Sequence, residues 1–139
     1  MASTLFLVDK SALEQRRRSD EARRLLVRLL AAGAVATCHV VAMEVLFSAR
    51  NRRDYEALHS EIGALRWLAT DDPAMDRALE VQRVLAQRGQ HRLPIPDLML
   101  AATAERHGAT VLHFDEDFDL ISAVTGQPTR WIVPRPSGA

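Results

Sequence analysis

The stretch Thr4-Leu-Phe-Leu-Val8, followed directly by Asp9, decides the fold predicted for this 139-residue chain. An apolar run of this length is too short for a helix of its own and is typical of a strand covered on both faces. A second run of this kind, Thr110 to Phe114, stops at Asp115. Two predicted strands that lie far apart in the sequence therefore end at a carboxylate.

Strand and helix patterns alternate between these two runs. Val35 to Val40 and Leu65 to Ala69 are predicted to be further strands. Apolar residues at helical spacing, N-cap residues, and proline at first helical positions predict the helices. These are residues 19–32, a segment through Glu44, residues 52–64, a segment starting at Asp71-Asp72-Pro73 and one starting at Pro94-Ile-Pro-Asp97. The alternation predicts an α/β domain with a central, mainly parallel β-sheet flanked by helices.

Composition indicates one globular domain. The chain is 47% hydrophobic and 26% charged, with 18 basic against 18 acidic side chains, and no linker divides it. We expect residues 1–133 to form the domain and residues 134–139 a short flexible C-terminal tail. The single cysteine, Cys38, excludes an internal disulfide and a cysteine-based zinc site. Because no apolar run approaches the ~20 residues of a membrane span, we expect a cytoplasmic protein with no membrane partner.

Carboxylates are predicted to meet at one edge of the sheet. Asp9 and Asp115 end strands, and Asp97 opens a helix behind two prolines. Glu44 lies within Val40 to Phe47, which is too apolar to be a solvated face, so it needs a buried partner or a metal. Such a cluster raises its own pKa values unless a cation compensates it. Oxygen ligands suit Mg²⁺ or Mn²⁺, so the sequence predicts a divalent-metal site.

Each acid also has a simpler interpretation. Asp97 could be only a helix N-cap, and so could Asp115 if residues 116–122 are helical. Asp117 could reach the same metal or face solvent. Glu116 and Asp119 are expected to face solvent.

The order and spacing of these motifs resemble the PIN-domain toxins of the VapC type over essentially the whole chain. The residues that carry the resemblance are Asp9-Lys10-Ser11, Glu44, Pro94-Ile-Pro-Asp97 and His113-Phe-Asp-Glu-Asp-Phe118. The resemblance implies a single PIN-like domain and a metal-dependent endoribonuclease that uses Mg²⁺ (or Mn²⁺). It implies the catalytic quartet Asp9, Glu44, Asp97 and Asp115, and the metal ligands Asp9, Asp97, Asp115 and Asp117. Ser11 matches a small hydroxyl residue at the substrate site, whereas Lys10 stands where a small residue or Thr is common.

The same resemblance implies partners. Toxins of this type bind a cognate VapB-type antitoxin, whose tail places a basic side chain against the carboxylates, and they are commonly homodimers. Their RNA substrates are transfer RNA or ribosomal RNA. Arg16, Arg17 and Arg18 are candidates for binding substrate phosphates or are a solvated face. Arg50, Arg52 and Arg53 could contact phosphates or belong to a protein interface.

Two rival functions stay open at this point. The first is a PIN-like nuclease that is not a toxin and acts on other RNA or single-stranded DNA. The second is a non-catalytic α/β binding module whose acids hold a metal for folding or grip a basic peptide. A phosphoryl-receiver domain is set aside because it needs a lysine late in the chain and the only lysine is Lys10.

Overall fold

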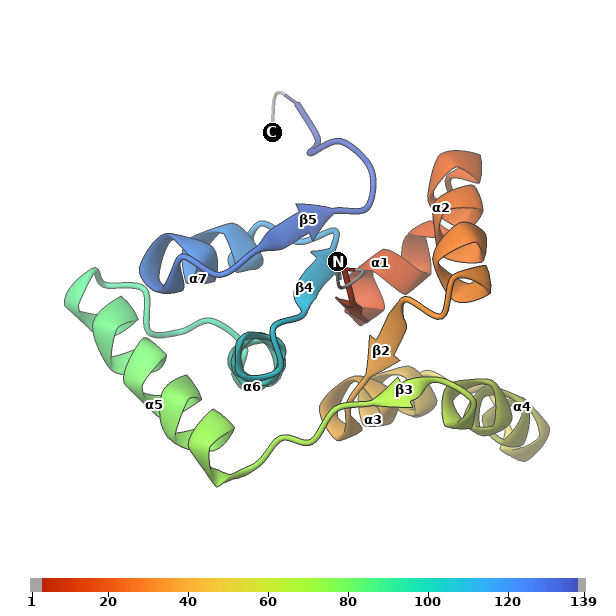
Figure 1. The fold of residues 1–139 in the computed structure, drawn as a ribbon, viewed down its shortest axis with the longest axis horizontal. Coiled ribbons are helices and arrows are strands. Elements are labelled where there is room, and N and C mark those ends of the chain that lie inside the picture. The colour runs from red at the N-terminus through yellow and green to blue at the C-terminus, as the bar shows by residue number, and fades with distance from the viewer. Residues whose placement is uncertain (1–3, 138–139) are drawn as a thin grey trace.

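The computed structural model describes residues 4–137, which form a five-stranded sheet and seven helices (Figure 1). The strands are β1 (Phe6–Val8), β2 (Val35–Thr37), β3 (Arg66–Trp67), β4 (Thr110–His113) and β5 (Thr129–Trp131). The helices are α1 (Lys10–Gln15), α2 (Asp20–Ala31), α3 (His39–Phe47), α4 (Arg52–Gly63), α5 (Asp72–Gln87), α6 (Ile95–Arg106) and α7 (Asp117–Thr125). Every strand pair is parallel, which confirms the predicted α/β class.

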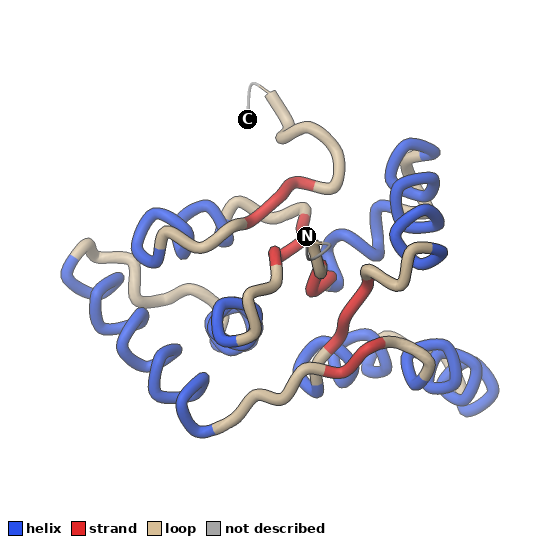
Figure 2. Tube along the Cα trace, viewed as in Figure 1, coloured by secondary structure: helices blue, strands red, loops and turns tan. Residues whose placement is uncertain are grey.

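The strand order β3-β2-β1-β4-β5 places β1 in the middle of the sheet. Phe6 of β1 pairs with Val35 of β2 on one side and with Thr110 of β4 on the other. In open parallel sheets, a crevice forms beyond the carboxyl ends of the strands where the strand order reverses. Figure 2 shows the strands in the middle of the molecule with helices around them. The fold therefore places a crevice directly after β1 and β4.

Both faces of β1 are buried, as the apolar run predicts. Leu7 packs in the larger core, which includes Leu85 of α5 and residues of α6 and α7. Phe6 and Val8 point to the opposite face and pack in a second core with Leu26 of α2. Two apolar layers thus hold the central strand from both sides.

The predicted strand over Val35–Val40 is wrong in its second half. β2 ends at Thr37, and α3 already begins at His39. Val40 and Val41 favour strands locally, but as helical residues both are buried in the larger core. Tertiary packing therefore overrides the local preference, and His39 lies in a helix rather than in a strand.

Three elements were not among those predicted. α1 has only six residues, β5 is a three-residue strand at the sheet edge, and α7 was considered only as an option for residues 116–122. Residues 134–137 form no helix or strand, and the last two residues of the predicted tail lie outside the described residues. The domain boundary after residue 133 stays a prediction. No helix among residues 4–137 is long and apolar enough to cross a membrane.

Truncating the central strand should cost far more stability than truncating an exposed helix position. Leu7 is 0% exposed and Leu79 of α5 is 67% exposed. We expect Leu7→Ala to lower the free energy of unfolding by about 2–5 kcal/mol, through lost burial and a residual cavity. The control Leu79→Ala should change it by less than about 0.5 kcal/mol. Urea denaturation measures both, and equal losses would contradict the assigned core.

Candidate metal centre

Acidic side chains from four segments meet beyond the carboxyl ends of β1 and β4. Asp9 follows β1 directly, and Asp115 lies two residues after β4. Asp97 lies in the first turn of α6. Glu44 lies on α3, which packs against both α1 and α6. The structure therefore brings together the acids that the sequence singles out.

The tightest group consists of Asp97, Asp115 and Asp117. One carboxylate oxygen of each lies within 4.8 Å of the others, in an arrangement that could hold a metal ion. Adjacent oxygen ligands of octahedral Mg²⁺ lie about 2.9 Å apart and opposite ones about 4.2 Å apart, so the three oxygens would have to move closer together to share one ion. All donors are oxygens, which suits Mg²⁺ or Mn²⁺.

Asp97 is the most strongly perturbed acid of the centre. Burial is the main cause that raises its pKa to about 8, and the negative charges of Asp9, Asp115, Asp117 and Glu44 add to the shift. Asp97 is only 8% exposed. At neutral pH this carboxyl keeps its proton unless a cation takes the proton's place.

Helix capping does not account for Asp97 or Asp115. Pro94 is the N-cap residue of α6, so the interpretation of Asp97 as only an N-cap is wrong. Glu116, not Asp115, occupies the N-cap position of α7. Asp115 nevertheless accepts a hydrogen bond from the backbone N–H of Asp117 at 3.0 Å, which fixes the turn between them.

Asp9 is held in place by Ser11. Its Oδ2 accepts hydrogen bonds from the backbone N–H of Ser11 at 3.0 Å and from the Ser11 hydroxyl at 2.5 Å. The same hydroxyl accepts from the backbone N–H of Phe114 at 2.9 Å, so it links the end of β1 to the segment after β4. Burial raises the pKa of Asp9, although the bonds from Ser11 oppose the shift. The predicted contact of Ser11 with substrate stays a prediction.

Glu44 carries an unsatisfied oxygen. Its Oε1 is buried and has no hydrogen-bond partner among residues 4–137. Burial raises the pKa of Glu44, and the charge of Asp9 raises it further, whereas Lys10 lowers it. Lys10 itself forms an ion pair with Glu14 at 3.6 Å. The apolar neighbours of Glu44 indicated that it needs a buried partner or a metal. No protein group among residues 4–137 provides a hydrogen bond to its Oε1.

Comparison with known proteins assigns the chain to a family. The PIN domain family model matches residues 6–124. The chain is 44% identical over 129 residues to Ribonuclease VapC51 of Mycobacterium tuberculosis, covering 93% of each protein. It is 42% identical over 134 residues to Ribonuclease VapC18 of the same organism, covering 94% of this chain and 97% of that protein. The chain belongs to the VapC group of the PIN domain family.

Solved structures of the same fold agree with this assignment. A chain in the crystal structure of DNA-bound VapBC from Salmonella typhimurium superposes with a TM-score of 0.76 at 17% identity. The match covers 94% of this chain and 100% of that one. The two chains therefore share a fold at low sequence identity.

His113 is part of the core of this PIN domain and contacts Asp115. It is fully buried, and its ring packs against Phe118 and Trp131. Burial lowers the pKa of His113, so the imidazole stays neutral. Its Nδ1 accepts a hydrogen bond from the backbone N–H of Asp115 at 3.2 Å, which helps to orient that acid.

The expectation that Asp119 faces solvent is wrong. Its Oδ1 accepts a hydrogen bond from the indole N–H of Trp131 at 3.2 Å, and its Oδ2 pairs with Arg135 at 3.2 Å. Glu116 is exposed as expected, and it also pairs with Arg135, at 3.4 Å. The sequence contains no local signal for these contacts, because they join α7 to β5 and to the tail beyond it.

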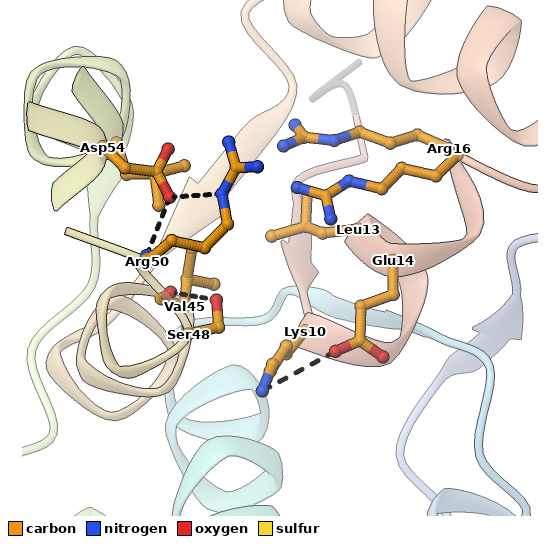
Figure 3. Close-up of a pocket in the computed structure, with 10 residues that line it drawn as sticks. Lys10, Leu13, Glu14, Arg16, Val45, Ser48, Arg50 and Asp54 are labelled. Carbon is orange, nitrogen blue, oxygen red and sulfur yellow. Dashed lines mark hydrogen bonds and ion pairs between the residues drawn. The ribbon is translucent and has the colours of Figure 1, made fainter.

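The arginine run divides in the structure. Arg16 and Arg17 line a cleft with Arg50, which comes from the segment between α3 and α4 (Figure 3). Arg18 is exposed and is not among the residues that line this cleft. Two arginines of the run therefore line the cleft, together with a third arginine from another segment.

The raised pKa of Asp97 predicts a pH-dependent stability in the absence of metal. Between the ordinary pKa near 3.8 and the folded-state value of about 8, the folded protein binds a proton that the unfolded chain has released. Stability therefore falls as pH rises through this window. In chelator, thermal melting at about pH 8 and about pH 5 should show this fall for the wild type.

The variant Asp97→Asn tests the assignment, because it has no proton to lose at this position. We expect a flatter pH dependence and, at about pH 8, a melting temperature equal to or above that of the wild type. Asp76→Asn, an exposed position on α5, is the matched control. A loss of more than about 4 °C in Asp97→Asn would contradict the repulsion among these acids.

Proposed function

We propose that this chain is the toxin of a type II toxin–antitoxin pair and a metal-dependent endoribonuclease that hydrolyses RNA phosphodiester bonds to inhibit translation. The observation that carries the proposal is the convergence of carboxylates from four segments around Asp97, with its pKa near 8. Relatives more than 40% identical over nearly the whole chain are named ribonucleases of the VapC type. Transfer RNA and ribosomal RNA are the substrate classes that we propose.

We assign the roles in the reaction as follows from the geometry. The proposed catalytic set is Asp9, Glu44, Asp97 and Asp115, and the proposed metal ligands are Asp9, Asp97, Asp115 and Asp117. When bound, Mg²⁺ or Mn²⁺ lowers the pKa of a coordinated water and offsets negative charge on the phosphate. Ser11 holds Asp9 in one orientation. Glu44, whose Oε1 has no partner within residues 4–137, is available to accept a proton from a water.

The two rival functions are less well supported. A binding module that uses its acids only for folding has no need of an acid that stays protonated at neutral pH, as Asp97 does without a cation. A nuclease that is not a toxin would share the centre, and finding an antitoxin reading frame beside its gene would count against this rival. The names of the relatives favour the toxin.

An apolar groove supports the antitoxin part of the proposal. It lies between α2 and α4, has a volume of about 860 Å³, and is lined by residues that include Leu26, Leu58 and Ile62. Val27 and Leu30 of α2 also line it and are 60% and 51% exposed. A groove of this kind suits the apolar face of an amphipathic helix. We propose that a segment of the VapB-type antitoxin occupies it, since chains of this fold occur in VapBC structures.

The predicted homodimer stays part of the proposal. Met43 and Phe47 on α3 are 62% and 89% exposed, and large apolar side chains with this exposure are candidates for a contact between two copies. They lie outside the groove between α2 and α4. The two partners therefore need not compete for one surface.

A charge placed in the groove should weaken binding of the antitoxin. We expect Leu30→Glu to weaken binding of the neighbouring antitoxin gene's product by at least about tenfold, because a carboxylate would be desolvated in an apolar contact. Leu79→Glu, at an exposed apolar position on α5 outside this groove, should bind like the wild type. Calorimetry on both variants decides the matter, and unchanged affinity in Leu30→Glu would exclude this groove.

The metal centre is tested by Mn²⁺ calorimetry followed by an RNA cleavage assay. The wild type should bind Mn²⁺ and cleave RNA only when the metal is present, because the acids repel phosphate without a cation. Asp97→Asn should lose Mn²⁺ binding and lower the cleavage rate by at least about 100-fold, with an intact fold by circular dichroism. Asp76→Asn should retain both. Equal Mn²⁺ binding by wild type and Asp97→Asn would remove Asp97 from the centre.

A further inference from the structure

A basic cleft lies between α1 and the segment that runs from α3 into α4 (Figure 3). Its charged lining consists of Lys10, Glu14, Arg16, Arg17, Arg50 and Asp54, and its apolar floor includes Leu13, Val45 and Leu58. The cleft has a volume of about 130 Å³. This is well below the ~300–1,000 Å³ of a pocket for a small-molecule ligand, so it suits one group of an extended chain.

Ion pairing leaves the cleft with surplus positive charge. Lys10 pairs with Glu14, and the Nε of Arg50 lies 3.6 Å from a carboxylate oxygen of Asp54. Both acids of the lining are thereby matched. Arg16 and Arg17 form no ion pair with any residue in the range 4–137.

The Arg50 pair is the looser element of this lining. The side chain of Arg50 is 85% exposed, and such an exposed pair contributes little stability. Figure 3 shows the guanidinium groups of Arg50 and Arg16 on opposite sides of the same opening. Arg50 is therefore available to a second anion.

The inner end of the cleft adjoins the metal centre. Lys10, which lines the cleft, follows Asp9 directly in the chain. The charges of Lys10 and Glu14 both act on Glu44, and Val45 beside Glu44 contributes to the cleft floor. From Lys10, the α1 helix rises about 10 Å to reach the arginines at its end.

We propose that this cleft binds backbone phosphates of single-stranded RNA that flank the bond held at the metal centre, through Arg16, Arg17 and Arg50. The inference rests on the proposed nuclease function. Acids at the centre repel phosphates, so an RNA strand needs cationic contacts just outside it. Guanidinium groups suit phosphate because they donate two parallel hydrogen bonds. The small volume favours backbone contacts and therefore binding that is independent of base sequence.

An acidic protein segment is the alternative occupant, and continuity with the metal centre favours RNA over it. A strand whose phosphate lies at the centre must continue onto an adjoining surface, and the cleft is such a surface with charge of the right sign. A protein segment has no comparable requirement to start at the acids. The test therefore includes an acidic peptide as a competitor.

The test measures RNA binding without cleavage. A 5′-fluorescein-labelled, mixed-sequence single-stranded RNA is titrated in EDTA by anisotropy, at salt concentrations from about 25 to 150 mM. Affinity falls as salt rises, with a slope of about −0.7 per phosphate contact in a plot of log affinity against log salt. Loss of two contacts should therefore make this slope less steep by about 1.4. We expect this change and about tenfold weaker binding in the double variant Arg16→Gln/Arg17→Gln. Thermal melting confirms that each variant is folded.

Matched controls remove the same charge elsewhere. Arg24→Gln on α2 changes an exposed arginine that does not line the cleft, and Arg18→Gln changes the next residue of the run. Both should bind RNA within about twofold of the wild type. Losses in these controls equal to those of the cleft variants would show general attraction rather than a site, and would overturn the proposal.

Two further outcomes separate the possibilities. Hexaglutamate binding that depends on Arg16 and Arg17, with RNA binding unchanged, would assign the cleft to an acidic protein segment and overturn the proposal. Absence of RNA binding by the wild type would also overturn it. The binding assay contains no metal and is therefore independent of cleavage. A wild type that binds RNA through these arginines but does not cleave it after Mg²⁺ or Mn²⁺ is added would refute the nuclease function alone. Metal-dependent cleavage with an unaltered salt slope in the double variant would refute the cleft alone.

Discussion

Asp97, Asp115 and Asp117 hold carboxylate oxygens within 4.8 Å of one another, and bringing like charges this close costs free energy that the fold or a cation must offset. The fold creates this cost, because the first turn of α6 brings Asp97 to the segment after β4 that carries Asp115 and Asp117. Without metal, the pKa of Asp97 rises to about 8, so a proton reduces the repulsion. The two buried apolar layers around β1 supply stability that offsets the repulsion among these acids.

A chain of hydrogen bonds keeps this edge in one arrangement. The hydroxyl of Ser11 donates to Asp9 and accepts from the N–H of Phe114. The backbone N–H of Asp115 donates to Nδ1 of His113. The carboxylate of Asp115 in turn accepts a hydrogen bond from the backbone N–H of Asp117. The acids are therefore oriented mainly by backbone and neutral groups, which leave their negative charge free for a cation rather than cancelling it.

The acids could be predicted from sequence because each has a local signal. Two end apolar runs, one follows a Pro-Ile-Pro segment, and Glu44 stands in an apolar helix. The helix α1 has no comparable signal, because its start depends on the bond from Asp9 to the N–H of Ser11. The meeting of Arg50 with Arg16 could not be predicted either, since only the packing of α1 on α3 joins them. Local patterns reveal residues at element ends, whereas tertiary packing decides which of them face each other.

Although the net charge is zero, negative and positive side chains are concentrated on two neighbouring surfaces. The acid cluster is suited to hold a cation, but its own field repels the phosphates of any RNA that approaches. The cleft with its surplus of guanidinium groups adjoins it through Lys10 and Glu14, which act on Glu44. The cleft attracts an RNA strand and the acids repel it, so the strand is favoured to lie across the boundary between the two surfaces. One of its phosphates can lie at the acid cluster only when a cation is bound there. Metal and substrate would in this way favour each other's binding, since each removes a charge that opposes the other.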